Sequence, residues 1–176
     1  MSDFWMKKMN TYFMRIDFDG DGKITRNDFE SMANRFAESG KLPEEKSKDL
    51  FETLTAIWDK FLMNVAGGGG ITKEMFIETM KKAVRDPNLK SAVEGPLPLF
   101  FHAVDSNSDG FISEEEYGEF FKILGMDPNL APASFKAIDT NNDGLLSEDE
   151  FRVSGTDFFL SEDQNCPTKY FWGPLV

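Results

Sequence analysis

Two stretches of this sequence decide its fold: Asp105-Ser-Asn-Ser-Asp-Gly-Phe-Ile-Ser-Glu-Glu-Glu116 and Asp139-Thr-Asn-Asn-Asp-Gly-Leu-Leu-Ser-Glu-Asp-Glu150. Each places oxygen-bearing side chains at its first, third, fifth and twelfth positions and a glycine at its sixth. Ca²⁺ takes 6–8 oxygen ligands in flexible geometry, and the glycine lets the backbone turn sharply around the ion. Both stretches therefore have the complete pattern of a calcium-binding loop.

A third copy, Asp17-Phe-Asp-Gly-Asp-Gly-Lys-Ile-Thr-Arg-Asn-Asp28, keeps the pattern but closes with Asp instead of Glu. Apolar residues at helical spacing flank every copy. Those before the first copy are Trp5, Met9, Tyr12, Phe13 and Ile16. One such match in a long protein could be accidental, but three within 176 residues, each between two amphipathic helices, identify EF-hands.

The expected metal ligands are the side chains at the first, third, fifth and twelfth loop positions and the backbone carbonyl at the seventh. They are Asp17, Asp19, Asp21, Lys23 and Asp28 in the first loop, Asp105, Asn107, Asp109, Phe111 and Glu116 in the third, and Asp139, Asn141, Asp143, Leu145 and Glu150 in the fourth. The ninth position, from which a side chain can reach the ion through water, is occupied by Thr25, Ser113 and Ser147.

The first loop differs from the other two in its charge and in its closing residue. It carries four carboxylates, whereas the third and fourth loops carry three each. Asp28 is one methylene shorter than Glu, and binding through a single oxygen would bring the coordination number toward the six that Mg²⁺ prefers. We therefore expect three Ca²⁺ sites with Mg²⁺ competing at some of them, and a mixed Ca²⁺/Mg²⁺ site in the first loop.

A second loop is expected in the gap between the first and the third. Paired loops join through a short antiparallel strand at their eighth position, which is occupied by Ile24, Ile112 and Leu146. Ile71 is the natural counterpart, which makes Asn64 the first position and Met75 the twelfth. Met75 cannot supply the closing carboxylate, so this loop is retained in structure but inactive in metal binding. A phosphate-binding loop at Gly67–Gly70 is the alternative, but no Gly-Lys-Ser/Thr sequence follows it.

These features predict an all-α fold of four EF-hands in two pairs, packed into one compact unit, with short antiparallel β links between the paired loops. We expect an N-terminal pair at residues 1–90, a C-terminal pair at 91–160 and an apolar tail at 161–176 that packs on the core. Gly40 should end one helix, and Pro98 should lie in the first turn of another. The apolar residues that follow the last loop's helix and need burial are Phe158, Phe159, Leu160, Tyr170, Phe171, Trp172, Leu175 and Val176. Seated between the two pairs, they would act as a built-in ligand.

Charge and composition exclude several classes of protein. The formal net charge of −12 argues against nucleic-acid binding, which requires a basic surface. The sequence contains neither a signal-type segment at Met1–Asn10 nor an 18-residue apolar run. The single Cys166 excludes an internal disulfide and suits a reducing compartment. We therefore expect a cytoplasmic protein that does not bind membranes.

Longer runs of sequence resemble one family in particular. They are Tyr-Phe-Met-Arg-Ile-Asp-Phe-Asp at 12–19, Val-Glu-Gly-Pro-Leu-Pro-Leu-Phe-Phe at 93–101, Ala-Pro-Ala-Ser-Phe at 131–135, Asp-Thr-Asn-Asn-Asp-Gly-Leu-Leu-Ser at 139–147 and the terminal Phe-Trp-Gly-Pro-Leu-Val. In these runs the chain resembles the invertebrate sarcoplasmic calcium-binding proteins, most closely the annelid members. The resemblance implies a compact arrangement of four EF-hands and a high-affinity cytosolic Ca²⁺ and Mg²⁺ buffer, especially in muscle. We expect a monomer without an obligate protein partner.

Two other functions remain open from the sequence. A calcium sensor would expose a Met-rich groove to a target helix, and nine Met residues are a sensor-like number. However, Met9, Met32, Met63 and Met80 interleave with aromatic residues, as in an ordinary core. Coelenterazine-dependent photoproteins, which are Ca²⁺-triggered oxygenases, share the arrangement of active loops but hold their substrate with several histidines, whereas His102 is the only one here. No nucleophile arrangement accompanies Cys166 or His102, so we expect no enzyme.

Overall fold

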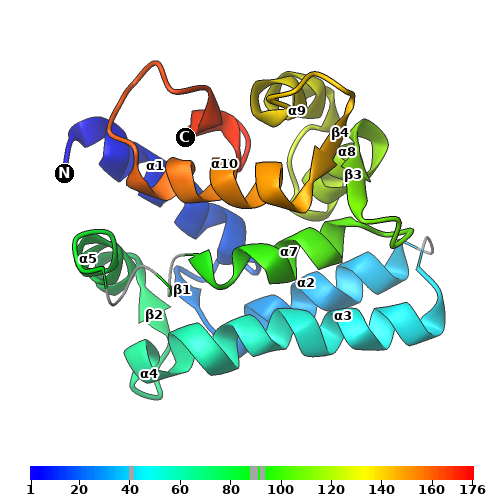
Figure 1. Ribbon diagram of the computed structural model, residues 1–176. Coiled ribbons are helices and arrows are strands. Elements are labelled where there is room, and N and C mark those ends of the chain that lie inside the picture. Colours follow the sequence, from blue (N-terminus) through cyan, green and yellow to red (C-terminus); the bar gives the residue numbers. More distant parts are fainter. Residues whose placement is uncertain (40–41, 88–90, 92–93) are drawn as a thin grey trace.

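The computed structural model describes residues 1–39, 42–87, 91 and 94–176 (Figure 1). Its first half contains α1 Asp3–Ile16, β1 Lys23–Ile24, α2 Arg26–Glu38, α3 Glu44–Ile57, a π-helical turn Trp58–Leu62, α4 Met63–Ala66, β2 Ile71–Thr72 and α5 Lys73–Ala83. Its second half contains α7 Leu97–Val104, β3 Phe111–Ser113, α8 Glu114–Ile123, a 3₁₀ turn Pro128–Leu130, α9 Ala131–Ile138, β4 Leu145–Ser147, α10 Glu148–Leu160 and a second 3₁₀ turn Pro167–Tyr170. The predicted all-α fold with paired EF-hands is confirmed.

Two short antiparallel strand pairs join the loops at the predicted register. Ile24 lies opposite Ile71 in the first pair, and Ile112 lies opposite Leu146 in the second. All four side chains are fully buried. The second loop therefore keeps its place in the fold, because its strand residue pairs with the partner strand and packs in the core.

Sequence signals at the helix starts explain where the exiting helices begin. Ser113 and Ser147 each cap a helix: their hydroxyls accept the backbone N–H of Glu116 and Glu150, and these carboxylates accept the N–H of the capping serine. This reciprocal capping box satisfies two backbone donors at once. Pro98 lies in the first turn of α7, as predicted. The expected helix stop at Gly40 and the expected boundary at residue 90 lie outside the described residues.

The helix before the second loop departs from the predicted pattern. Regular spacing predicts a continuous buried face from Leu50 to Leu62, and the structure inserts a π-helical turn at Trp58–Leu62. Such a turn carries one residue more than an α-helical turn and rotates the following side chains. As a result Trp58 is buried, whereas Phe61 and Leu62 are only half-buried. Met63, which was expected in the core with Met9, Met32 and Met80, is 51% exposed.

The C-terminal tail packs against elements from both halves of the chain. The Trp172 ring lies 4.9 Å from that of Tyr12 on α1, 5.0 Å from that of Phe100 on α7 and 5.8 Å from that of Phe120 on α8. The Tyr117 hydroxyl donates to the Phe171 carbonyl at 2.7 Å. Not all of the tail is buried as expected: the Tyr170 and Val176 side chains are 41% and 51% exposed. They lie at the surface because the tail meets the core along one side only.

Basic side chains of α1, α2 and α3 also reach the second half of the chain, where they donate to backbone carbonyls. The pairs are Lys8 with Phe158 and Ser161, Arg15 with Trp172 and Pro174, Arg35 with Ile123, and Lys46 with Asp105 and Ser106. Carbonyls at helix C-termini have no intrahelical partner and carry partial negative charge. The cations of Lys8, Arg35 and Lys46 meet such carbonyls and stabilise the packing of the first half on the second, whereas Arg15 donates to carbonyls of the C-terminal tail.

Candidate metal centres

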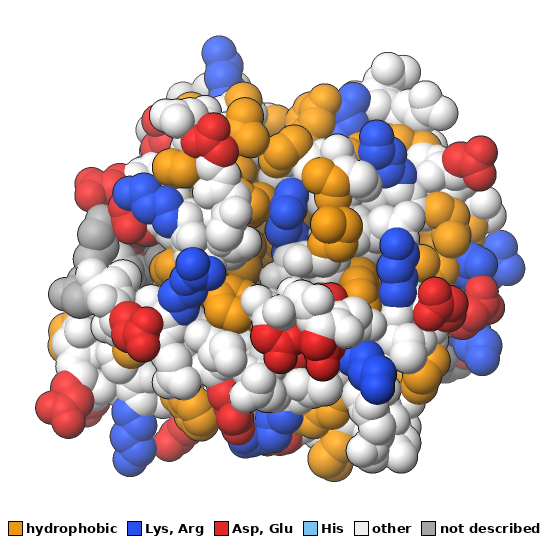
Figure 2. All heavy atoms as spheres, turned by 180° about the vertical axis from the view of Figure 1, so that it is seen from behind, with side chains coloured by type: hydrophobic (Ala, Val, Ile, Leu, Met, Phe, Trp, Pro, Cys, Tyr) orange, Lys and Arg blue, Asp and Glu red, His pale blue; other side chains and the backbone are white. Residues whose placement is uncertain are grey.

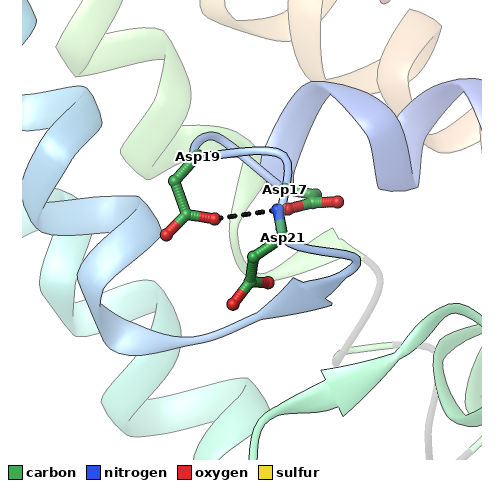
Figure 3. Close-up of side chains that lie close together, drawn as sticks. All are labelled: Asp17, Asp19 and Asp21. Atoms are coloured by element: carbon green, nitrogen blue, oxygen red, sulfur yellow. Dashed lines mark hydrogen bonds between the residues drawn. The ribbon is translucent and has the colours of Figure 1, made fainter.

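Three carboxylates of the first loop lie close together. Asp17, Asp19 and Asp21 each contribute an oxygen to a cluster in which these atoms all lie within 4.8 Å of one another. Figure 3 shows the three side chains directed toward the inside of the loop between α1 and β1. The loop is held in this shape by its own amides, since the Asp21 N–H donates to Asp19 Oδ1 at 3.1 Å and the Lys23 N–H donates to Asp21 Oδ1 at 2.8 Å. Three carboxylates this close repel each other unless a cation joins them.

The closing carboxylates of the third and fourth loops each connect the two ends of their loop. Glu116 Oε1 accepts the backbone N–H of Ser106 at 3.0 Å and of Asn107 at 3.3 Å, while its Oε2 accepts the N–H of Ser113 at 2.9 Å. Glu150 makes the equivalent contacts in the fourth loop.

Asp28 also reaches both ends of its loop, although it is shorter by one methylene. Its Oδ1 accepts from the N–H groups of Phe18 and Asp19, and its Oδ2 accepts from the N–H of Thr25. The Asp28 side chain is fully buried. The first loop therefore draws its closing residue inward, as the shorter side chain requires.

The first aspartate of the first, third and fourth loops has one carboxylate oxygen without a partner in the described part of the chain. In every case Oδ2 accepts the N–H of the loop glycine, at 3.0 Å for Asp17, 3.1 Å for Asp105 and 3.0 Å for Asp139. The other oxygen, Oδ1, is buried and accepts no hydrogen bond within the described part of the chain. A buried acceptor left unpaired costs about 1–3 kcal/mol, and more if it is charged. The same orphaned atom in three loops fits a metal ion, which would supply the missing partner.

The environment shifts the pKa of two of these carboxyls in opposite directions. Burial raises the pKa of Asp17, helped by the negative charges of Asp28, Asp21 and Asp19 and opposed by the Gly22 N–H. Burial alone would also raise the pKa of Glu150, but hydrogen bonds, chiefly from Ser147, outweigh it and the pKa is lowered. The ionised form of Asp17 is thus disfavoured in the absence of a cation, whereas hydrogen bonds favour the ionised form of Glu150.

The second loop lacks this arrangement. Asn64, its expected first position, lies inside the short helix α4, and Met75, its expected twelfth, is 38% exposed on α5. Gly67 leaves α4 in a left-handed conformation with φ of 55°. Two features resemble the other loops: the strand pairing at Ile71 and the helix cap at Thr72, whose hydroxyl accepts the N–H of Met75.

Three kinds of residue contribute to the site without having been predicted from the sequence. The hydroxyls of Ser106 and Thr140, at the second position of their loops, donate to Glu116 and Glu150 at 2.9 and 3.1 Å. A hydroxyl residue at this position is a signal that the sequence offers, and the first loop has Phe18 instead. The second kind is the residue at the ninth loop position, which was predicted to reach the ion through water. In the structure such a residue, for example Ser147, caps the following helix. The third is Lys46, which lies 59 residues before Asp105 and has no local signal.

The fold and the loops together define an EF-hand protein. The family of EF-hand domain pairs matches residues 97–153, and the EF-hand family matches residues 9–33. The chain is 64% identical to the sarcoplasmic calcium-binding protein of Perinereis vancaurica tetradentata and 61% identical to that of Hediste diversicolor, in both cases over 99% of this chain and 100% of the relative. The chain belongs to the sarcoplasmic calcium-binding proteins.

A solved structure outside the annelids has a similar fold. The coelenterazine-binding protein of Renilla muelleri, in its calcium-loaded apo form, superposes with a TM-score of 0.79 at 25% identity, covering 99% of this chain and 100% of that one. The annelid relatives are calcium-binding EF-hand proteins and not enzymes. Among the described residues, no helix has both the length and the apolar character needed to cross a bilayer.

Proposed function

We propose that this protein is a high-affinity cytoplasmic calcium buffer with three EF-hand sites, of the kind that works in the sarcoplasm of muscle. Its ligands would be the fifteen residues named from the sequence, with the first, third and fourth loops active and the second inactive. The observation that carries the proposal is the buried, unpaired Oδ1 of Asp17, Asp105 and Asp139. In each of the three loops the same atom lacks a hydrogen-bond partner, and a bound ion would take the place of that partner.

The first site is proposed to take both Ca²⁺ and Mg²⁺. Asp28 is drawn into the loop, where its Oδ1 accepts from the N–H groups of Phe18 and Asp19 and its Oδ2 accepts from the N–H and the hydroxyl of Thr25. Its side chain is one methylene shorter than Glu, and coordination of the ion through a single oxygen would give the lower, near-octahedral number that suits Mg²⁺. At rest this site would hold Mg²⁺, and its departure would limit the uptake of Ca²⁺. The protein would then shape the decay of a calcium transient more than its onset.

Buffering is favoured over sensing by how the two halves are joined. A sensor opens on binding Ca²⁺ and exposes a groove, whereas a buffer barely opens. Here Trp172 packs between α1, α7 and α8, and basic side chains such as Lys8 and Arg35 bond across the halves. On the face in Figure 2, apolar side chains reach the surface interspersed with charged ones. We propose that residues 1–90 and 91–160 form two EF-hand pairs, that 161–176 ties them together, and that the protein acts as a monomer.

The photoprotein alternative has weaker support. It rests on the Renilla structure, which is named for coelenterazine binding. In this chain His102 is exposed and lies beside Phe101 on α7. Its position outside the core, together with the absence of other histidines from the sequence, leaves no cluster of the kind that the photoprotein reaction requires.

Calorimetric titration of metal-free protein with Ca²⁺, with and without millimolar Mg²⁺, tests the proposal. We expect three sites in the buffer range, with dissociation constants of roughly 10⁻⁹–10⁻⁸ M, weakened by Mg²⁺. Glu116→Gln and Glu150→Gln should each abolish one high-affinity site. Glu114→Gln is the matched control, since it removes the same charge inside the third loop at a position that is not a ligand. Three micromolar sites indifferent to Mg²⁺ would refute the buffer and favour the sensor.

A further inference from the structure

Lys46 occupies an unfavourable place on its own helix. It lies in the first turn of α3, beside Glu44 and Glu45. The positive end of the helix dipole favours acidic residues there and disfavours a lysine. Its ammonium instead lies at the C-terminal end of α7, where Asp105 is the capping residue and the dipole is negative. In Figure 1 the beginning of α3 and the end of α7 lie on the same side of the molecule.

The contacts of Lys46 fall on the first residues of the third loop. Its Nζ donates to the carbonyl oxygen of Asp105 at 2.9 Å and to that of Ser106 at 3.1 Å. The N–H groups of the same two peptide units belong to Ser106 and Asn107, and both donate to Glu116 Oε1, at 3.0 and 3.3 Å. Two successive peptide planes are therefore clamped, by an ammonium on their oxygen side and by the closing carboxylate on their nitrogen side.

We propose that Lys46, which is not a ligand, is a positioning residue for the third metal site. By fixing the peptide planes that follow Asp105, it holds the first and the last ligand of the loop, Asp105 and Glu116, in the relative orientation that the ion needs. The first half of the chain thereby contributes to the affinity of a site in the second. The inference rests on the proposed function of the third loop.

The charge of Lys46 acts in the opposite direction, because an ammonium near the loop repels Ca²⁺. Lys46 is half-buried, and it lines a surface pocket together with Asp49, His102 and Ser108. Water and salt in this pocket screen the repulsion, whereas the two direct hydrogen bonds, at 2.9 and 3.1 Å, are weakened less. Positioning should therefore outweigh repulsion, and removal of the ammonium should weaken the site.

Three variants separate these effects. Lys46→Met keeps an unbranched stem and removes the ammonium, and Lys46→Arg keeps the charge and the donors. Lys48→Met removes the same charge from an exposed position of the same helix. The three loops can be followed individually by the amide resonances of Gly22, Gly110 and Gly144, because each donates to the first aspartate of its own loop. Ca²⁺ is titrated into the metal-free, ¹⁵N-labelled full chain in competition with a chelator.

We expect Lys46→Met to weaken Ca²⁺ binding at Gly110 about ten-fold, the value of one charged hydrogen bond, and to leave Gly22 within about two-fold. Lys46→Arg should restore most of the affinity, and Lys48→Met should have no site-specific effect. Equal or tighter binding at Gly110, or the same loss at all three glycines, would overturn the role of Lys46. If Gly110 of the unmodified protein does not respond to Ca²⁺ at all, the proposed function of the third loop fails first.

Discussion

Replacement of Trp172 by alanine tests whether the tail holds the two halves together. The side chain is 1% exposed and lies among the rings of Tyr12, Phe100 and Phe120. A buried aromatic side chain covers roughly 150–250 Å², which at about 25 cal/mol per Å² corresponds to about 4–6 kcal/mol. The indole N–H offsets part of this, because it has no partner within the described residues and its burial costs about 1–3 kcal/mol. We expect Trp172→Ala to lower the free energy of unfolding by about 3 kcal/mol.

The same reasoning predicts a much smaller effect for Trp172→Phe. The smaller ring keeps most of the aromatic contacts and removes the unpaired N–H, so the free energy of unfolding should change by less than about 1 kcal/mol. Tyr170→Ala is the control within the same segment, since its ring is 41% exposed. It should cost no more than about 1 kcal/mol.

Unfolding by guanidinium, followed by circular dichroism, measures all three variants. The free Ca²⁺ concentration must be equal throughout, because a ligand that binds the folded state raises its apparent stability. If Trp172→Ala loses no more stability than Tyr170→Ala, the tail does not hold the halves together. If Trp172→Phe loses as much as Trp172→Ala, the indole N–H has a partner and its assignment as an unpaired donor is wrong.

Two further predictions concern packing and pH. A Cβ added to Gly155 on α10 would lie 2.6 Å from Leu97 Cδ2, so Gly155→Ala should cost about 1–3 kcal/mol by thermal or guanidinium unfolding. Gly118→Ala on α8, where nothing lies within 4 Å, should instead stabilise the protein by up to about 1 kcal/mol, and equal effects would contradict the packing. Burial raises the pKa of Tyr12 and Tyr117 above the value of 10.0 expected when they are unfolded. The stability due to their neutral forms is therefore complete below about pH 10 and falls as the pH rises further. A titration of phenolate absorbance should show both hydroxyls ionising only as the protein unfolds, and ionisation in the folded state would contradict their burial.

The sequence was sufficient for the loops because their rules are local. The ligand pattern from Asp105 to Glu116 and the position of Ile71 depend on fixed spacing within twelve residues, and the strand pairing follows from them. The fold class was predictable for the same reason. The metal ligands themselves remain predictions, supported by the orphaned oxygens of Asp17, Asp105 and Asp139.

Features that depend on contacts between distant segments were not predictable from spacing. The π-helical turn at Trp58–Leu62 breaks a helical repeat that the sequence continues without interruption. Tyr170 and Phe171 are adjacent aromatic residues, yet one is exposed and the other is buried, because only one side of the tail faces the core. The bonds of Lys46 depend on the packing of α3 against α7, which no local motif encodes.

The way in which the loops are paired also predicts how the sites bind ions. The third and fourth loops share the strand pair β3–β4, and both have the complete ligand pattern in the sequence. Occupation of one can order the other, so these two sites should bind Ca²⁺ cooperatively. The first loop is paired through β1–β2 with the second loop, which lacks the ligand pattern, so we expect no bound ion in its partner to influence it. We expect the Ca²⁺ titration curve of the Gly22 resonance to have a Hill slope near one and those of Gly110 and Gly144 to be steeper. One chain would then bind Ca²⁺ gradually at its first site and over a narrow concentration range at the other two.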